Sequence, residues 1–179
     1  MQRRGEHVRK TGKEEYASFY EGYINLIPEG NVIEILEQQA EQVQAAFHSL
    51  SEEEGNYRYS EGKWSVKEVL GHLTDNERIM STRLLRIARG DTTPLPGYDQ
   101  DVFMDGHPFE TYSIVDMAEE YTVVRQSTLV MLRHLSPEAW LRKGIANNYT
   151  ASARAIACVI AGHELHHLAI LRDRYNVLV

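Results

Sequence analysis

The feature that most constrains this chain is an apolar stretch near its C-terminus that carries three histidines. Residues 155–171 are apolar or glycine except for the segment His163-Glu164-Leu165-His166-His167. One series of residues in this part of the chain is spaced at alternating steps of four and three, which places its members on one face of a helix. The series is Ile156, Ile160, His163, His167, Ile170 and Arg174. The spacing predicts a long helix over about 151–175, with His163 and His167 on its core-facing seam.

Three more long helices are predicted from helix-start signals and apolar repeats. Each begins at a polar residue that is followed three positions later by an acidic one: Asn31 with Glu34, Ser65 with Glu68, and Ser113 with Asp116. The second helix is expected to end at Gly90, and residues 90–112 and 135–149 are expected to be long loops. No segment alternates convincingly between polar and apolar residues as a strand does. We therefore expect an all-α fold, a four-helix bundle with long connecting loops, formed by residues 31–179.

Residues 1–30 are predicted to form an extension before the bundle. Their first dozen residues are polar and basic, and aromatic residues then follow at helical steps: Tyr16, Phe19, Tyr20 and Tyr23. This pattern predicts a short amphipathic helix that ends before Pro28 and packs as an outer strap. We expect its aromatic side chains to serve core packing.

Composition excludes several classes of protein. The formal net charge of −7 argues against a nucleic-acid-binding surface, which needs a clustered basic face. No window approaches the roughly 18 apolar residues of a membrane span, and the basic N-terminus lacks the apolar run of a signal peptide. The single cysteine, Cys158, excludes an internal disulfide and is expected in the core. These observations favour a cytoplasmic protein with no membrane or nucleic-acid partner.

The two seam histidines predict a metal site that needs a third ligand. Side chains four residues apart project on one side of a helix, and a catalytic zinc site takes three protein ligands and one open position. His72 is the leading third candidate, since it lies near the capped start of the second helix, although about 100° from the centre of its apolar face. His166 could replace His167 by its distance from His163, but it lies off the seam. The alternative is that the histidines are ordinary polar residues of the core.

The segment 163–167 also matches the H-E-x-x-H signature of zinc proteases, in which Glu164 would be the general base. Only twelve residues follow His167, however, and the larger protease classes take their third ligand well downstream. An exposed helix residue is therefore the favoured interpretation of Glu164. In the loop 90–112, Tyr98 and Asp99 are candidates for contacts with substrate or with a ligand imidazole, and Asp99 is equally interpreted as a helix cap.

Three segments resemble the DinB/YfiT-like superfamily of metal-binding four-helix proteins. They are residues 62–73 around Trp64-Ser65 and His72, residues 162–168 around the three histidines, and Tyr98-Asp99-Gln100. The resemblance implies a divalent metal held by His72, His163 and His167, and dimers are common among similar proteins. It implies one of three activities: a metal-dependent hydrolase, a transferase that adds a low-molecular-weight thiol (bacillithiol, mycothiol or glutathione) to an electrophile, or a thiol-dependent isomerase.

These observations leave several functions open. The favoured one is a transferase that uses zinc or nickel and a thiol co-substrate on a small-molecule electrophile, with the loop 90–112 at the pocket mouth. The second is a hydrolase with a metal-bound hydroxide as nucleophile and Glu164 or Asp99 as base. The third is a metal-stabilised stress-response binding protein without turnover, in which His166, His107 or Asp99 closes the coordination sphere. The last is an interaction protein without metal.

Overall fold

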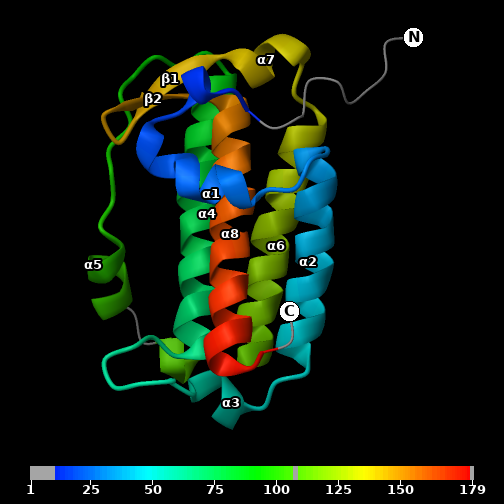
Figure 1. Cartoon of the computed structure of the whole chain (residues 1–179), viewed down its shortest axis with the longest axis vertical. Coiled ribbons are helices and arrows are strands. Elements are labelled where there is room, and N and C mark those ends of the chain that lie inside the picture. The colour runs from blue at the N-terminus through cyan, green and yellow to red at the C-terminus, as the bar shows by residue number, and fades with distance from the viewer. Residues whose placement is uncertain (1–10, 107–108, 178–179) are drawn as a thin grey trace.

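The computed structural model describes residues 11–106 and 109–177, and its main body is a bundle of four long helices (Figure 1). They are α2 (Val32–His48), α4 (Val66–Ala88), α6 (Ile114–Arg133) and α8 (Ala153–Tyr175). This confirms the predicted four-helix bundle. None of the helices in the described part of the chain is long and apolar enough to cross a membrane.

The connection from α4 to α6 is long because these two helices run in the same direction. In Figure 1 both rise from the α3 end of the molecule, whereas α2 and α8 descend towards it. The chain after α4 must therefore return along the whole bundle before α6 can begin. This connection carries α5 (Gln100–Asp105) and a short 3₁₀ turn, Phe109–Thr111. α4 packs against both α6 and α8, and α2 packs against α6 and more lightly against α8.

Local sequence signals set most helix ends. The Ser65 side chain accepts a hydrogen bond from the Glu68 N–H while the Glu68 carboxylate accepts one from the Ser65 N–H, which is the predicted capping box. Ser113 caps α6 in the predicted way, through the Asp116 N–H. Asn31 is the N-cap of α2, but it accepts from the Ile33 N–H instead of joining Glu34 in a box.

The end of α4 is a Schellman motif built on Gly90. The Gly90 N–H donates to Ile87 O and the Asp91 N–H donates to Arg86 O, each over 2.9 Å. Gly90 has φ +86°, a left-handed conformation that glycine adopts without steric cost. The predicted helix stop at this residue is confirmed.

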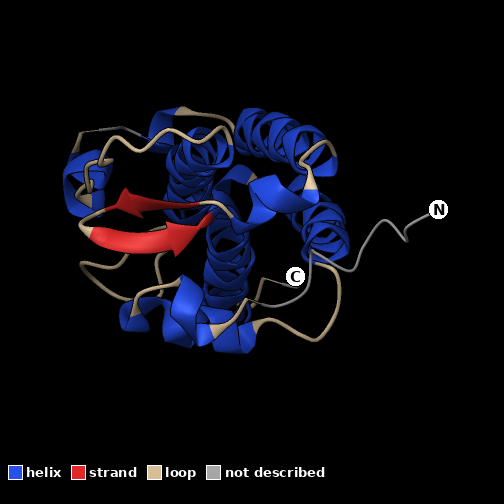
Figure 2. Ribbon diagram, turned by 90° about the horizontal axis from the view of Figure 1, so that it is seen from above, coloured by secondary structure: helices blue, strands red, loops and turns tan. Residues whose placement is uncertain are grey.

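Residues 135–149 are not the loop that the sequence analysis expects. They contain α7 (Pro137–Leu141), the strand β1 (Lys143–Ala146) and the start of β2 (Tyr149–Ser152). The strands form an antiparallel hairpin in which Lys143 pairs with Ser152, and it covers one end of the bundle (Figure 2). The turn residues Asn147 and Asn148 have φ of 52° and 65°, as in the tight hairpin turns that asparagine favours. The Asn-Asn pair was the missed signal, because each strand is too short to show alternation.

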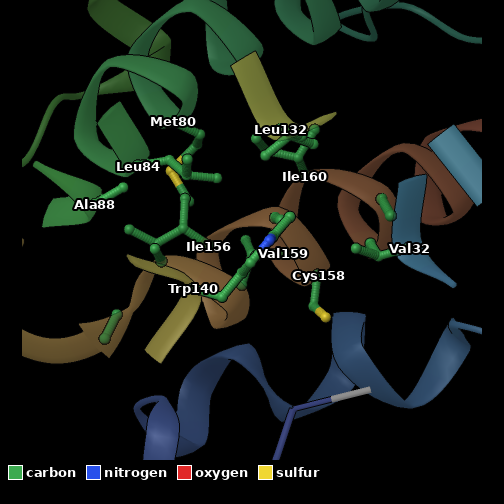
Figure 3. Close-up of a cluster of buried hydrophobic side chains, with 14 of the residues drawn as sticks. Val32, Met80, Leu84, Ala88, Leu132, Trp140, Ile156, Cys158, Val159 and Ile160 are labelled. Atoms are coloured by element: carbon green, nitrogen blue, oxygen red, sulfur yellow. The ribbon is translucent and has the colours of Figure 1, made fainter. Parts of the chain in front are cut away.

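The bundle interior holds two clusters of buried apolar side chains. The first lies towards the hairpin end and includes Leu84, Ile156 and Ile160 (Figure 3). Cys158 belongs to it, as predicted, and is fully buried. The second lies towards α3 (Glu52–Asn56) and includes Phe47 and Val69. The histidines of α8 fall where the chain passes from one cluster to the other.

The N-terminal segment crosses the bundle as a strap. Its helix, α1 (Glu21–Leu26), lies against α8 and passes in front of α4 and α8 in Figure 1. Ile24 and Ile27 provide the buried anchors. The close approach depends on Gly162, because a Cβ there would lie 2.2 Å from the carbonyl oxygen of Tyr23.

A buried carboxylate also ties the strap to the start of α8. Glu15 accepts hydrogen bonds from Ser152 Oγ at 2.7 Å and from the Gly12 N–H at 3.0 Å, and it forms an ion pair with Arg154. The strap is therefore attached at both of its ends, by Glu15 on one side and by the apolar anchors of α1 on the other.

Candidate metal centre

Three histidines from two helices meet in the bundle. His72 lies about two turns into α4, and His163 and His167 lie on the facing side of α8. The Nε2 atoms of His72 and His163 are 3.1 Å apart, and one ring nitrogen from each of the three residues lies within 4.8 Å of the other two. The structure thus brings together the three residues that the sequence analysis selects as metal ligands.

Burial keeps these imidazoles neutral. His72 and His163 are buried, with 3% and 8% of their surface exposed, and His167 is partly exposed. Burial disfavours the charged form and lowers the pKa of His72 to about 4. Burial, together with the neighbouring His72 and His166, lowers the pKa of His167 to about 3. The pKa of His163 falls well below its ordinary value for the same reasons. At neutral pH each ring therefore keeps a lone pair for a metal ion.

The spacing and the donor set fit a divalent metal ion. At Zn–N bonds of about 2.0–2.1 Å, two tetrahedral ligands are about 3.4 Å apart, close to the separation of His72 and His163. An all-imidazole set suits zinc, nickel, copper or iron. Among the described residues no fourth histidine, cysteine or carboxylate joins this group. His107, one of the suggested fourth ligands, lies outside the described residues.

Aromatic rings pack around the histidines. The Trp64 ring lies 4.9 Å from the His72 ring and is stacked at 6.5 Å on that of His167. Tyr23 of the strap meets His163 edge-on at 5.3 Å. Trp64 directly precedes Ser65, the N-cap of α4. The local signal that starts α4 therefore also positions the Trp64 ring beside the histidines.

The structure corrects the expectation that Glu164 is an exposed helix residue. Only 2% of it is exposed. Its carboxylate accepts hydrogen bonds from the Tyr121 hydroxyl at 2.8 Å and from Arg125 Nη2 at 2.5 Å. Glu164 is one residue after His163, so it is turned about 100° around the helix and faces α6. It is buried there because α8 is enclosed by other helices on several sides. This network holds the carboxylate on the side of α6.

Arg125 is the centre of that network, and sequence reasoning missed it. It lies in α6, is fully buried, and also contacts Glu77 of α4 at 2.8 Å and the Leu36 carbonyl of α2 at 3.0 Å. One guanidinium thus links all four bundle helices. A signal was present, since Arg125 stands at helical steps from Tyr121 and Thr128 on the apolar stripe of α6.

A cavity of about 400 Å³ adjoins the cluster at His163. The strap, α4, α8, the hairpin turn, the loop before α5 and the first residue of α5 provide its lining residues: Phe19, Tyr20, Tyr23, Asn76, Met80, Arg83, Tyr98, Asp99, Gln100, Asn147, Val159 and His163. The aromatic residues of the strap were expected in the core. Tyr16 and Tyr20 do pack, partly buried, against the first apolar cluster. Phe19, Tyr20 and Tyr23 also form a wall of this cavity, and Ile24 and Ile27 provide the fully buried contacts of the strap.

The loop candidates also lie at the cavity. The Tyr98 hydroxyl accepts a hydrogen bond from Asn76 Nδ2 at 2.6 Å. Asp99 caps α5 by accepting from the Asp101 N–H at 2.9 Å, which is the cap role that the sequence analysis weighs. His166 is exposed, and its ring packs edge-on against Tyr23 instead of joining the other three histidines.

The fold and the site together define a four-helix-bundle protein with a buried three-histidine cluster that opens onto a cavity. The family model described as the DinB superfamily matches residues 35–171, and the chain belongs to that superfamily. The resemblance drawn from the residues around His72 and His163 is thereby confirmed.

Known proteins similar to this chain carry metal-dependent and thiol-dependent names. A protein of Oceanobacillus iheyensis, provisionally named a metal-dependent hydrolase, is 26% identical over 160 residues, or 82% of this chain and 88% of its own. YfiT from Bacillus subtilis, described provisionally as a metal-dependent hydrolase with an unusual four-helix bundle topology, matches with a TM-score of 0.71. It is 16% identical, and 93% of each chain is covered. A mycothiol-dependent maleylpyruvate isomerase matches with a TM-score of 0.63 and 13% identity, over 82% of this chain and 64% of its own.

Proposed function

We propose that His72, His163 and His167 hold one divalent metal ion, zinc or nickel, and that the protein transfers a low-molecular-weight thiol to a small electrophile. The observation that carries the proposal is a cluster of three neutral imidazoles that opens, at His163, onto a cavity of small-molecule size. A catalytic site needs both, namely ligands that bind the metal and room beside them for a substrate.

The chemistry divides between the metal and the chain. When bound, the metal ion lowers the pKa of a thiol or water in its open position, so that a nucleophile is available at neutral pH. The chain keeps the imidazoles unprotonated by burial and holds the electrophile in the cavity beside His163. In the transfer the thiol loses its proton to solvent and the sulfur bonds to the electrophilic carbon. The leaving group then departs with the electron pair of the broken bond.

Two alternatives remain distinct from this proposal. A hydrolase would use water instead of the thiol, and the names of the Oceanobacillus iheyensis relative and of YfiT favour it. The mycothiol-dependent name of the third similar protein favours the thiol. A metal-stabilised binding protein without turnover is favoured less, since it needs a fourth protein ligand and none joins the group in the described ranges.

The test begins with the elemental content of protein purified without an affinity tag. We expect about one metal ion per chain, lost in His72→Ala, His163→Ala and His167→Ala. Stoichiometric metal in all three variants would overturn the site. Turnover of chloronitrobenzene electrophiles with several thiols, set against hydrolysis of an ester and amide panel, separates transferase from hydrolase.

The proposal includes the homodimer that the resemblance implies. Sedimentation velocity of the untagged protein at several concentrations tests it, and a single species with the mass of one chain would contradict it.

A further inference from the structure

Arg83 of α4 is a buried cation at the same cavity. It is 6% exposed, and its guanidinium donates to the Pro96 carbonyl at 2.6 Å and contacts Met80 Sδ at 3.3 Å. In the described parts of the chain none of the ion pairs includes Arg83. Burying a charge without an opposite charge is costly.

The neighbouring arginines of the same helix show the contrast. Arg78 pairs with Glu120 at 2.7 Å and Arg86 pairs with Asp91 at 2.6 Å, although both are far more exposed than Arg83. The most buried arginine of α4 is thus the one without a carboxylate partner among the described residues. Such a cation is suited to an anion that comes from outside the chain.

The cavity around Arg83 does not neutralise it. The guanidinium lies over the Tyr98 ring, with Arg83 Cζ 5.8 Å from the ring centre. Burial raises the pKa of Tyr98 and of Tyr20, an effect that outweighs the opposing influence of Arg83, so both phenols are neutral at physiological pH. Asp99 also lines the cavity, but it is exposed and its carboxylate caps α5.

The guanidinium has donors to spare. An arginine carries five N–H groups in a planar fork, and two contacts of Arg83 are accounted for within the chain. A carboxylate matches two adjacent donors of such a fork. The aromatic rings of Phe19, Tyr20 and Tyr23 provide an apolar wall for the remainder of a ligand.

We infer that the cavity binds a small molecule carrying a carboxylate, with Arg83 receiving that group and the histidine cluster facing the reactive part. The position of the reactive part rests on the proposed function, whereas carboxylate recognition by Arg83 does not. A volume of about 400 Å³ suits a small aromatic or branched acid. The carboxylate belongs either to the electrophile or to the thiol.

Arg83 also borders a second groove, of about 360 Å³, on the outer side of α4. Arg86 lines that groove but not the cavity, so Arg86→Met is the matched control for Arg83→Met. Both substitutions replace one guanidinium of α4 by a flexible apolar chain of similar length.

The direct test uses benzoate and its neutral analogue benzamide as probes of the metal-loaded protein, with dissociation constants measured by NMR titration. A hydrogen bond between charged groups is considerably stronger than one between neutral groups, so we expect benzoate to bind at least about tenfold more tightly than benzamide. Arg83→Met removes this preference and Arg86→Met retains it. Equal binding of the two probes by the wild-type protein overturns the inference, even if Arg83→Met fails to fold. Benzoate preference that survives Arg83→Met also overturns it, because the metal is then the anion site.

Kinetics identify the source of the carboxylate. If it belongs to the electrophile, Arg83→Met raises KM for 4-chloro-3-nitrobenzoate but not for 4-chloro-3-nitrobenzamide. If it belongs to the thiol, KM rises for mercaptosuccinate but not for 2-mercaptoethanol. If Arg83→Met leaves KM unchanged for 4-chloro-3-nitrobenzoate and also for mercaptosuccinate, the inference is contradicted. Absence of any transfer by the wild type contradicts the proposed function, while the benzoate titration still decides the role of Arg83.

Discussion

Arg125 of α6 and Glu164 of α8 form a buried ion pair of 2.5 Å immediately beside the histidine cluster. Glu77 of α4 contacts the same guanidinium at 2.8 Å, so one cation serves two carboxylates in the core. Each carboxylate lies close to a histidine of the cluster on the same helix. Glu77 comes five residues after His72 on α4, and Glu164 directly follows His163 on α8. Arg125 of α6 therefore links α4 to α8 next to the histidine cluster.

Removing Arg125 should be severely destabilising. Arg125→Met leaves two buried carboxylates without a counterion, and breaking a buried pair costs about 3–5 kcal/mol. Urea unfolding followed by circular dichroism measures the free energy of unfolding. Arg133, also in α6, forms an exposed ion pair with Glu37 of α2, and Arg133→Met should cost no more than about 1 kcal/mol. Similar losses in both variants would show that the network is not the stronger support.

Zinc affinity should distinguish His167, a proposed ligand, from its neighbour His166 on α8. We expect His167→Ala to weaken zinc binding by about 100-fold or more, because even partners outside the coordination sphere contribute 10–100-fold. His166→Ala, one residue away but turned outward, should bind zinc as the wild type does. Competition with a chromogenic chelator gives both affinities. If His166→Ala loses the metal and His167→Ala keeps it, the choice of ligand is wrong.

The stability contributed by Glu15 should depend on pH. Burial alone would raise the pKa of this carboxyl, but the hydrogen bonds from Arg154, Gly12 and Ser152 outweigh it, and its pKa is lowered below the ordinary 4.5. A depressed pKa in the folded state stabilises the protein above the unfolded pKa, and this contribution is lost as the pH falls through the folded value.

Glu15→Gln should therefore be less stable than the wild type by about 1–2 kcal/mol at pH 7. The difference should shrink as the pH falls below 4.5, where the wild-type carboxyl takes up its proton. Thermal unfolding across pH 3–8 measures it. The exposed neighbour provides the control, Glu14→Gln. A difference that stays constant across this range would contradict the ionic role of Glu15.

Gly162→Ala should displace the strap. The added Cβ would lie 2.2 Å from the Tyr23 carbonyl, so α1 must move away from α8 at a cost of about 1–3 kcal/mol. Gly22→Ala in α1 itself meets no atom within 4 Å and should be neutral or stabilising. Unfolding free energies of the two variants test the contact. Since the strap walls the cavity, Gly162→Ala should also weaken binding of small aromatic probes.

Local chemistry made the helices and the three histidines predictable. A capping box at Ser65, a glycine stop at Gly90 and a four-three seam through His163 are short-range patterns. The box and the stop have the predicted form, whereas the seam is buried from Ile156 to His163 and becomes exposed by Arg174. His72 was selected because it follows a strong helix start. Its angle from the apolar face left its direction open, and packing of α4 against α8 buries it.

The hairpin, the buried Glu164 and the cavity were not predictable in the same way. Four-residue strands carry too little alternation, so the hairpin depends on contacts with the end of the bundle. Whether Glu164 is exposed depends on which helices enclose α8. The aromatic residues of the strap have the same spacing whether they fill the core or wall a cavity.

By itself, the sequence determined where the four long helices begin and that His163 and His167 share one face of a helix, because these features depend on residues within a few turns of one another. That His72 meets the other two depends on how α4 packs against α8. The tertiary structure alone decided that Arg125 joins Glu77 to Glu164 and that Arg83 meets His163 across one cavity. The groups that meet lie on different helices. Their meeting depends on how the helices rotate and cross when their apolar faces are buried.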